Sequence, residues 1–150
     1  MSNIKDDGTS LSFDVTVTNT GSVAGKDVVE VYYNPPYTNG GIEKASANLI
    51  AFEKTGLLEP GASETITVTF DKEEMASYDM SGTGCYVLEK GDYVIPINSD
   101  SHNILDSKTY TQNSDIRYDA DNKRDSDAAA AVNQFGDAAG DITYLSRADG

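Results

Sequence analysis

The residues best suited to nucleophilic chemistry are the single cysteine, Cys85, and the single histidine, His102. A thiolate activated by a neighbouring imidazole is a common enzymatic nucleophile. Cys85 opens an apolar run, where a lone cysteine usually behaves as a small buried hydrophobe, and His102 stands in the polar stretch 99–103, which indicates a loop. Because such pairs are defined by geometry and not by presence alone, the sequence favours structural roles for both residues.

The candidate for metal binding is a cluster of acidic residues near the C-terminus. It comprises Asp119, Asp121, Asp125 and Asp127. A calcium loop of the EF-hand type needs oxygen ligands at positions 1, 3 and 5, a glycine at 6 and a glutamate at 12. Counted from Asp119, position 5 is a lysine, position 6 an arginine and position 12 Ala130, so three of these five requirements fail. We therefore interpret the cluster as a solvated linker, and we expect neither a metal nor a cofactor.

Paired carboxylates are the machinery of glycoside hydrolysis, in which one acts as an acid and the other as a nucleophile or base. The chain has 25 acidic residues, so pairs of any spacing are easy to find and carry no information. Most of them stand at outward positions of β-rich runs or between such runs. We therefore assign no catalytic residue and expect no enzyme activity from this chain alone.

Tyrosines are the aromatic residues with most potential for binding, because the chain has nine of them and no tryptophan. Tyr32, Tyr33 and Tyr37 flank two prolines beside a glycine-containing loop, and an aromatic face can stack on a sugar ring. The alternative is that Tyr32 or Tyr33 packs in the core with its hydroxyl hydrogen-bonded, as buried tyrosines usually are. We expect this for one of that pair, and we retain Tyr33 and Tyr37 as candidates for contact with a sugar or with another domain.

The charge of the chain excludes some partners. A net charge of −14 repels polyanions, so we expect no nucleic-acid binding, which needs clustered lysine and arginine. No apolar run approaches the roughly 18 residues of a membrane span, and we expect no membrane partner. Nothing in the sequence assigns a cellular location.

The elements that would position these residues are short β-strands. Alternation of apolar and polar residues over 11–18 and 64–70 is typical of strands with one buried face. Strands are predicted over 11–18, 28–33, 47–55, 64–70, 85–89, 92–97 and 104–110. Six or seven strands with turn signals about every ten residues predict an all-β sandwich of the immunoglobulin or fibronectin type III kind.

Connections and boundaries follow from the residues between these strands. A short helical turn is predicted after Asp71, with Asp71 as its cap and Glu74 completing a capping box, and Lys90–Gly91 is predicted to join its flanking strands as a tight hairpin. We expect a flexible segment over 1–10, the sandwich over 11–110 and a flexible linker over 111–150. A marginal helix is predicted over 128–135. The first residues lack a hydrophobic signal core, and we expect the chain to begin inside a longer protein.

Three segments taken in order resemble one protein family: 15–32, which contains Asn19-Thr20-Gly21, then 49–61 and then 91–101. Together they are similar to the fibronectin type III-like domain of glycoside hydrolase family 3, the family of β-glucosidases and β-xylosidases. The similarity covers roughly 11–110. The segments 133–136 and 144–149 resemble the stretch that leads into the catalytic barrel in members with inverted domain order.

The resemblance implies a structural accessory domain without catalytic residues, because the nucleophile and acid of this family lie in other domains. Its implied partners are the catalytic domains of the same polypeptide, with carbohydrate as a further candidate. Two alternatives stay open from the residues: an autonomous carbohydrate-binding module, which needs an exposed aromatic platform, and a spacer or adhesin repeat. A sandwich fold by itself implies none of these functions.

Overall fold

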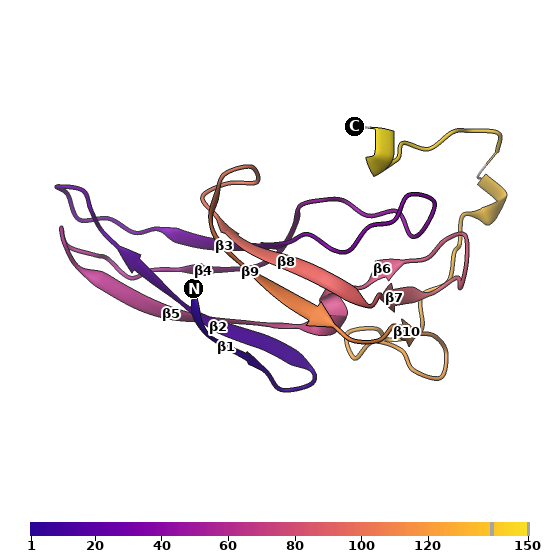
Figure 1. The fold of residues 1–150 in the computed structure, drawn as a ribbon, viewed down its shortest axis with the longest axis horizontal. Coiled ribbons are helices and arrows are strands. Elements are labelled where there is room, and N and C mark those ends of the chain that lie inside the picture. Colours follow the sequence, from indigo (N-terminus) through magenta and orange to yellow (C-terminus); the bar gives the residue numbers. More distant parts are fainter. Residues whose placement is uncertain (139, 150) are drawn as a thin grey trace.

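The computed structural model describes residues 1–138 and 140–149, and it is a sandwich of two sheets with a small third sheet at one end (Figure 1). The first sheet consists, in spatial order, of β1 (Ser2–Asp6), β2 (Ser10–Thr18) and β5 (Ser63–Asp71). The second consists of β4 (Asn48–Lys54), β3 (Val28–Tyr33), β8 (Gly91–Asn98) and β9 (Ile104–Gln112). The third consists of β10 (Ile116–Tyr118), β7 (Tyr86–Leu88) and β6 (Ser77–Tyr78). The fold class predicted from the sequence is confirmed.

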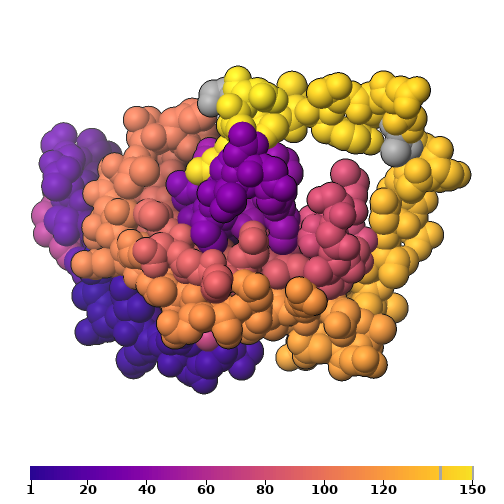
Figure 2. Space-filling model, turned by 45° about the vertical axis from the view of Figure 1, so that its right-hand side comes forward, coloured from indigo at the N-terminus to yellow at the C-terminus, as the bar shows by residue number. Residues whose placement is uncertain are grey.

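Three short 3₁₀ helices complete the chain, namely η1 (Lys72–Met75), η2 (Gly136–Ala138) and η3 (Arg147–Asp149). No helix in the described part of the chain is long and apolar enough to cross a membrane. Beyond β10 the chain forms an arch that stands off the sandwich, and Figure 2 shows an open gap between this arch and the body of the molecule.

The core lies between the two large sheets and is built by the alternation that the sequence shows. On β2, Leu11 and Phe13 point inward and are buried, and their cross-strand partners on β5 are Phe70 and Val68. From the opposite sheet, alternate residues of β3 and β8 fill the same layer, including the fully buried Tyr93. Burial of one such side chain contributes about 1.5–3 kcal/mol, so this interdigitated layer accounts for most of the hydrophobic stabilisation.

The ends of the sandwich extend beyond the sequence-based boundaries. We expected residues 1–10 to be flexible, but Ser2–Asp6 forms β1 and pairs with β2. We placed the end of the sandwich near residue 110, but β9 reaches Gln112 and β10 pairs with β7. All five residues of β1 are exposed, so no apolar alternation could reveal this strand, which is held by backbone pairing with β2 and by polar contacts such as the Lys72–Asp6 ion pair.

Of the two predicted connections, the hairpin at Lys90–Gly91 was wrong, and the short helical turn after Asp71 forms as η1 but without the predicted cap. Lys90–Gly91 does not close a hairpin, because β7 pairs with β6 and β10 while β8 pairs with β3 and β9. The chain changes sheets there, and Gly91 adopts φ of 135° where a Cβ atom would lie 2.9 Å from Cβ of Pro36. Asp71 makes no capping hydrogen bond to η1; its carboxylate instead accepts a hydrogen bond from Ser10 Oγ.

The helix predicted over 128–135 is not present. Residues 128–135 are irregular, and the single turn η2 follows directly after them. Most of these residues are exposed, so no packing compensates for the cost of nucleating so short a helix.

Candidate interaction sites

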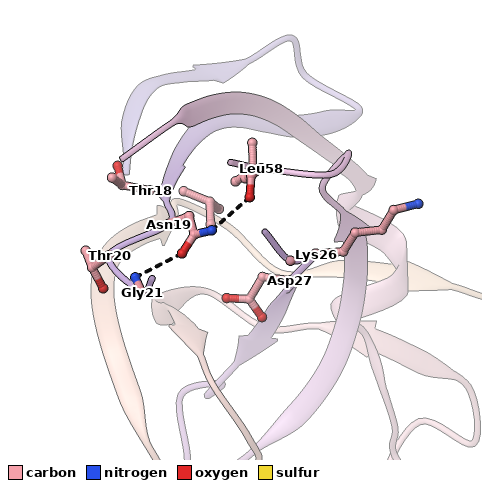
Figure 3. A pocket seen from close by; sticks show the side chains of 9 residues that line it. Thr18, Asn19, Thr20, Gly21, Lys26, Asp27 and Leu58 are labelled. Carbon is pink, nitrogen blue, oxygen red and sulfur yellow. Dashed lines mark hydrogen bonds between the residues drawn. The ribbon is translucent and has the colours of Figure 1, made fainter. Parts of the chain in front are cut away.

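The glycine turn after β2 lines a pocket of about 240 Å³, to which Leu58 and Asp27 also contribute. Asn19 Nδ2 donates a hydrogen bond to the Leu58 carbonyl oxygen at 2.8 Å (Figure 3) and another to the Val23 carbonyl oxygen at 2.9 Å. Its Oδ1 accepts one from the Gly21 amide at 2.9 Å. Asn19 therefore ties the loop after β2 to the β4–β5 connection. Its side chain already has three partners within the chain, so we interpret this turn as structural.

Tyr32 and Tyr33 are adjacent on β3 and point to opposite faces of the sheet. Each is only 9% exposed. The Tyr33 ring belongs to the core, where burial raises the pKa of its phenol. Tyr32 lies on the outer face and donates a hydrogen bond to Glu30 Oε2 at 3.0 Å, which raises the pKa of the Tyr32 phenol. Sequence reasoning expected one buried tyrosine here, and the structure buries both.

Tyr37 lies in the β3–β4 connection, where the end of the chain covers it. The Arg147 guanidinium carbon is 5.0 Å from the centroid of the Tyr37 ring. The phenol donates to Glu43 Oε2 at 3.2 Å and lies 3.0 Å from Ser146 Oγ. Glu43 also accepts hydrogen bonds from the Arg147 amide and from Ser146 Oγ, and these bonds lower the pKa of its carboxyl. We call this group of four residues the Tyr37 clasp.

A buried lysine holds the loop that carries the Tyr37 clasp. Lys44 is 7% exposed, and its ammonium donates to the Pro36 carbonyl at 2.7 Å and pairs with the Glu89 carboxylate. Glu89 directly follows β7, so this ion pair fixes the loop to the end of the sandwich. The sequence offered no signal for this pairing, since Lys44 stands in a polar stretch that resembles any solvated loop.

Comparison with known proteins assigns this chain to a family. The family model of the fibronectin type III-like domain matches residues 27–101. The chain belongs to that family. It is 38% identical over 113 residues to a beta-glucosidase of Ruminococcus albus, in a match that covers 73% of this chain and 12% of the relative. It is 44% identical over 82 residues to beta-glucosidase A of Butyrivibrio fibrisolvens, covering 53% of this chain and 10% of the relative.

Solved structures agree with these sequence matches. Beta-glucosidase 3B of Thermotoga neapolitana, solved in complex with alpha-D-glucose, superposes with a TM-score of 0.69 at 34% identity. That match covers 77% of the present chain, which contains the fibronectin type III-like domain, but only 16% of the Thermotoga chain. The chain thus spans a small part of the length of each of these relatives. The resemblance to family 3 glycoside hydrolases stated from the sequence motifs is confirmed.

The fibronectin type III-like domain holds the acidic C-terminal cluster by a second set of contacts. The Arg124 guanidinium carbon lies 3.7 Å from the centroid of the Tyr86 ring. Nε and Nη2 of the same guanidinium donate hydrogen bonds to the Asp127 carboxylate. Glu73 accepts hydrogen bonds from the amides of residues 125–126, which lower the pKa of its carboxyl against the opposing effect of burial. We call these contacts the Arg124 clasp.

The residues with the best potential for chemistry are kept apart in this domain. Cys85 is buried and its thiol donates to Thr83 Oγ1 at 3.2 Å. His102 lies in the β8–β9 turn, where Asp100 accepts the hydrogen bond of its amide, so the length of β8 separates the two. Across residues 1–138 and 140–149, no group of three or more histidine, cysteine, aspartate or glutamate side chains could hold a metal ion.

One outer face of the domain is covered with hydroxyl and carboxylate groups. Every second residue of β2 from Ser10 to Thr18, and of β5 from Ser63 to Asp71, is serine, threonine or aspartate. These residues pair in register, and the Thr16 and Thr65 hydroxyls are 3.0 Å apart. We call this surface the hydroxyl face. Such cross-strand pairs contribute roughly 0.2–1 kcal/mol each while both partners remain accessible to water.

The opposite outer face, on the four-stranded sheet, is apolar at several positions. Its outward apolar residues are Val28, Tyr32, Leu49, Phe52 and Ile104. Phe52, Glu30, Asn98 and Ile104 form one row across all four strands, as their pairing register shows. Leu49, Phe52 and Ile104 are 53%, 68% and 61% exposed. We call this surface the apolar face.

Proposed function

We propose that this chain is a non-catalytic structural domain of a longer glycoside hydrolase of the β-glucosidase type, in which it packs against the catalytic domains. The observation that carries the proposal is the share of each protein that the sequence match covers. The match to the Ruminococcus albus beta-glucosidase takes up 73% of this chain but only 12% of that enzyme. A domain that makes up a small part of such enzymes works together with their other domains.

The contacts of the chain support a structural role. Cys85 is buried, and the carboxylates of Glu43 and Glu73 are engaged in holding the C-terminal segment. The role of this domain is therefore to hold the elements and the chain connections around it.

The tyrosine geometry favours this role over an autonomous carbohydrate-binding module. A sugar-binding platform displays aromatic faces to solvent, but Tyr33 is in the core and Tyr37 lies beneath Arg147. Contact of Tyr37 with another domain stays a prediction. We further propose that residues 119–149 form the connection towards a catalytic barrel, as the inverted domain order implies, with the two clasps holding its course.

The test is an activity comparison between this chain and the full-length polypeptide that contains it. Hydrolysis of p-nitrophenyl β-D-glucoside is expected from the full-length protein and not from the 150-residue chain. Deletion of residues 11–118 from the full-length protein should lower its melting temperature by more than 5 °C and reduce activity. Hydrolysis by the chain alone, or an inactive full-length protein, would contradict the proposal.

A further inference from the structure

The two outer faces of the sandwich differ in chemistry, although they occupy equivalent positions in the fold. A sheet whose outer face stays in water alternates apolar-in with polar-out, and β2 and β5 follow this rule at every outward position. The apolar face departs from this apolar-in, polar-out alternation on β3, β4 and β9. Because the same chain achieves a fully polar face on the other sheet, the apolar residues are not a general feature of its surface.

Three of the apolar residues of this face, Tyr32, Leu49 and Phe52, lie next to one another, and Ile104 stands apart from them beyond Glu30 and Asn98. The register places Phe52 and Leu49 on β4 opposite Glu30 and Tyr32 on β3, and Ile104 at the far end of the Phe52 row. Single exposed apolar residues need no explanation, but contiguous ones rimmed by polar groups mark interaction surfaces.

The polar groups around this face are of both kinds. The Glu30 carboxylate accepts a hydrogen bond from the Tyr32 phenol, and Lys54 stands opposite Val28 on the same face. Asn98 Oδ1, in the same row as Glu30, is buried and has no donor among residues 1–138 and 140–149. An occupant that fits this surface therefore makes mainly apolar contact with Leu49 and Phe52, with polar groups at the rim.

We propose that the apolar face is the surface on which a catalytic domain of the same polypeptide packs, with the hydroxyl face left in water. This rests on the proposed function and names the surface that serves it. A neighbouring domain is the occupant because the matched segment makes up only 10–16% of the related enzymes, so most of such a polypeptide lies outside it.

Cysteine accessibility tests this directly. In a Cys85→Ala background, Leu49→Cys places a thiol on the apolar face and Thr65→Cys places one on the hydroxyl face; both positions are exposed strand residues in the chain. Maleimide labelling rates are measured for each thiol in the 150-residue chain and in the full-length polypeptide. We expect labelling of Leu49→Cys to slow at least tenfold in the full-length protein, and labelling of Thr65→Cys to change less than twofold. Equal melting temperatures of the two chain variants serve as the folding control.

The outcomes distinguish a failure of this inference from a failure of the proposed function on which it rests. Slowing at Thr65→Cys instead of Leu49→Cys overturns the choice of face but leaves an accessory domain that packs on its partner. No slowing at either position overturns both. Slow labelling of Leu49→Cys in the isolated chain that speeds up on dilution assigns the face to a second copy of the chain and also overturns the inference.

A matched pair of charge substitutions gives a second readout. Phe52→Asp places a carboxylate on the apolar face, and Thr65→Asp places one on the hydroxyl face. We expect both to leave the melting temperature of the 150-residue chain within 2 °C, and only Phe52→Asp to lower that of the full-length protein by more than 5 °C. Equal effects of both substitutions in the full-length protein would overturn the inference.

Discussion

The Arg124 guanidinium stacks on the Tyr86 ring, with its central carbon 3.7 Å from the ring centroid. This contact joins a residue beyond the last strand to the middle strand of the third sheet. Stacking and the two hydrogen bonds to Asp127 use the planar shape of the guanidinium. The C-terminal segment therefore follows a defined path past η1, although its composition is that of a linker.

Arg124→Ala should release this segment. Loss of a largely buried cation–π contact and of the ion pair with Asp127 is expected to weaken docking of residues 119–127 by about 1–2 kcal/mol. Amide hydrogen exchange should then speed up at Asp125 and Ser126, whose amides bond to Glu73. Arg117→Ala, on β10, is the control and should leave these amides slow; unchanged exchange in Arg124→Ala would contradict the role of the clasp.

Asn19→Ala should destabilise the whole sandwich. The substitution leaves the carbonyl oxygens of Val23 and Leu58 without their donor and frees the Gly21 amide, which is expected to cost about 2–3 kcal/mol. Urea unfolding measures the change. Thr20→Ala alters the exposed neighbour in the same turn and should cost less than about 0.5 kcal/mol; equal midpoints for both variants would show that Asn19 does not hold the loops.

The Tyr37 clasp should open in acid. Its hydrogen bonds lower the pKa of Glu43 from the ordinary value of 4.5. A carboxyl with a lowered pKa stabilises the docked state fully above pH 4.5 and loses that contribution as the pH falls through the lowered value. Amide exchange at Arg147, measured below pH 4.5 after correction for intrinsic rates, should show this loss of protection. Glu43→Gln should remove the pH dependence, whereas Glu59→Gln, an exposed glutamate in the β4–β5 turn, should preserve it.

Stability should decline at high pH because of a buried tyrosine. Burial raises the pKa of Tyr93 far above the ordinary value of 10.0, and its hydroxyl donates to the Glu89 carbonyl at 3.1 Å. The folded state therefore keeps its proton while the unfolded chain ionises, so stability is fully present below pH 10 and falls above it by up to about 1.4 kcal/mol per pH unit. Urea unfolding between pH 9 and 11 measures the slope. Tyr93→Phe should reduce the slope and leave the smaller contribution of tyrosines such as Tyr33, whose pKa is also raised; a slope unchanged in that variant would assign the decline to other groups.

Sequence reasoning succeeded where structure depends on neighbouring residues. The prediction of a strand over 28–33 coincides with β3, and those over 11–18 and 64–70 fall within β2 and β5. Alternation at period two reports which face of a strand is buried, so the inward Leu11 and Phe13 were predictable. The turn motif at Asn19 indicated the family, and the structure supplies the reason in its three hydrogen bonds.

Contacts between distant parts of the chain were beyond that reasoning. Lys90–Gly91 has the composition of a hairpin, yet β7 does not pair with β8; its partners are β6 and β10, and β10 lies more than twenty-five residues away. Tyr33 and Tyr37 look alike in the sequence, but one is placed in the core by strand alternation and the other is covered by Arg147.

The sequence by itself therefore determined the longer strands from β2 to β9, their inward faces and the family, because these depend on short-range periodicity and on three short motifs taken in order; it did not reveal β1, β6 or β10. The tertiary structure alone decided which strands pair, how the acidic tail is held and which outer face is apolar. Backbone pairing and ion pairs such as Lys44–Glu89 depend on which groups the fold brings together. Local composition does not indicate which distant residues become neighbours.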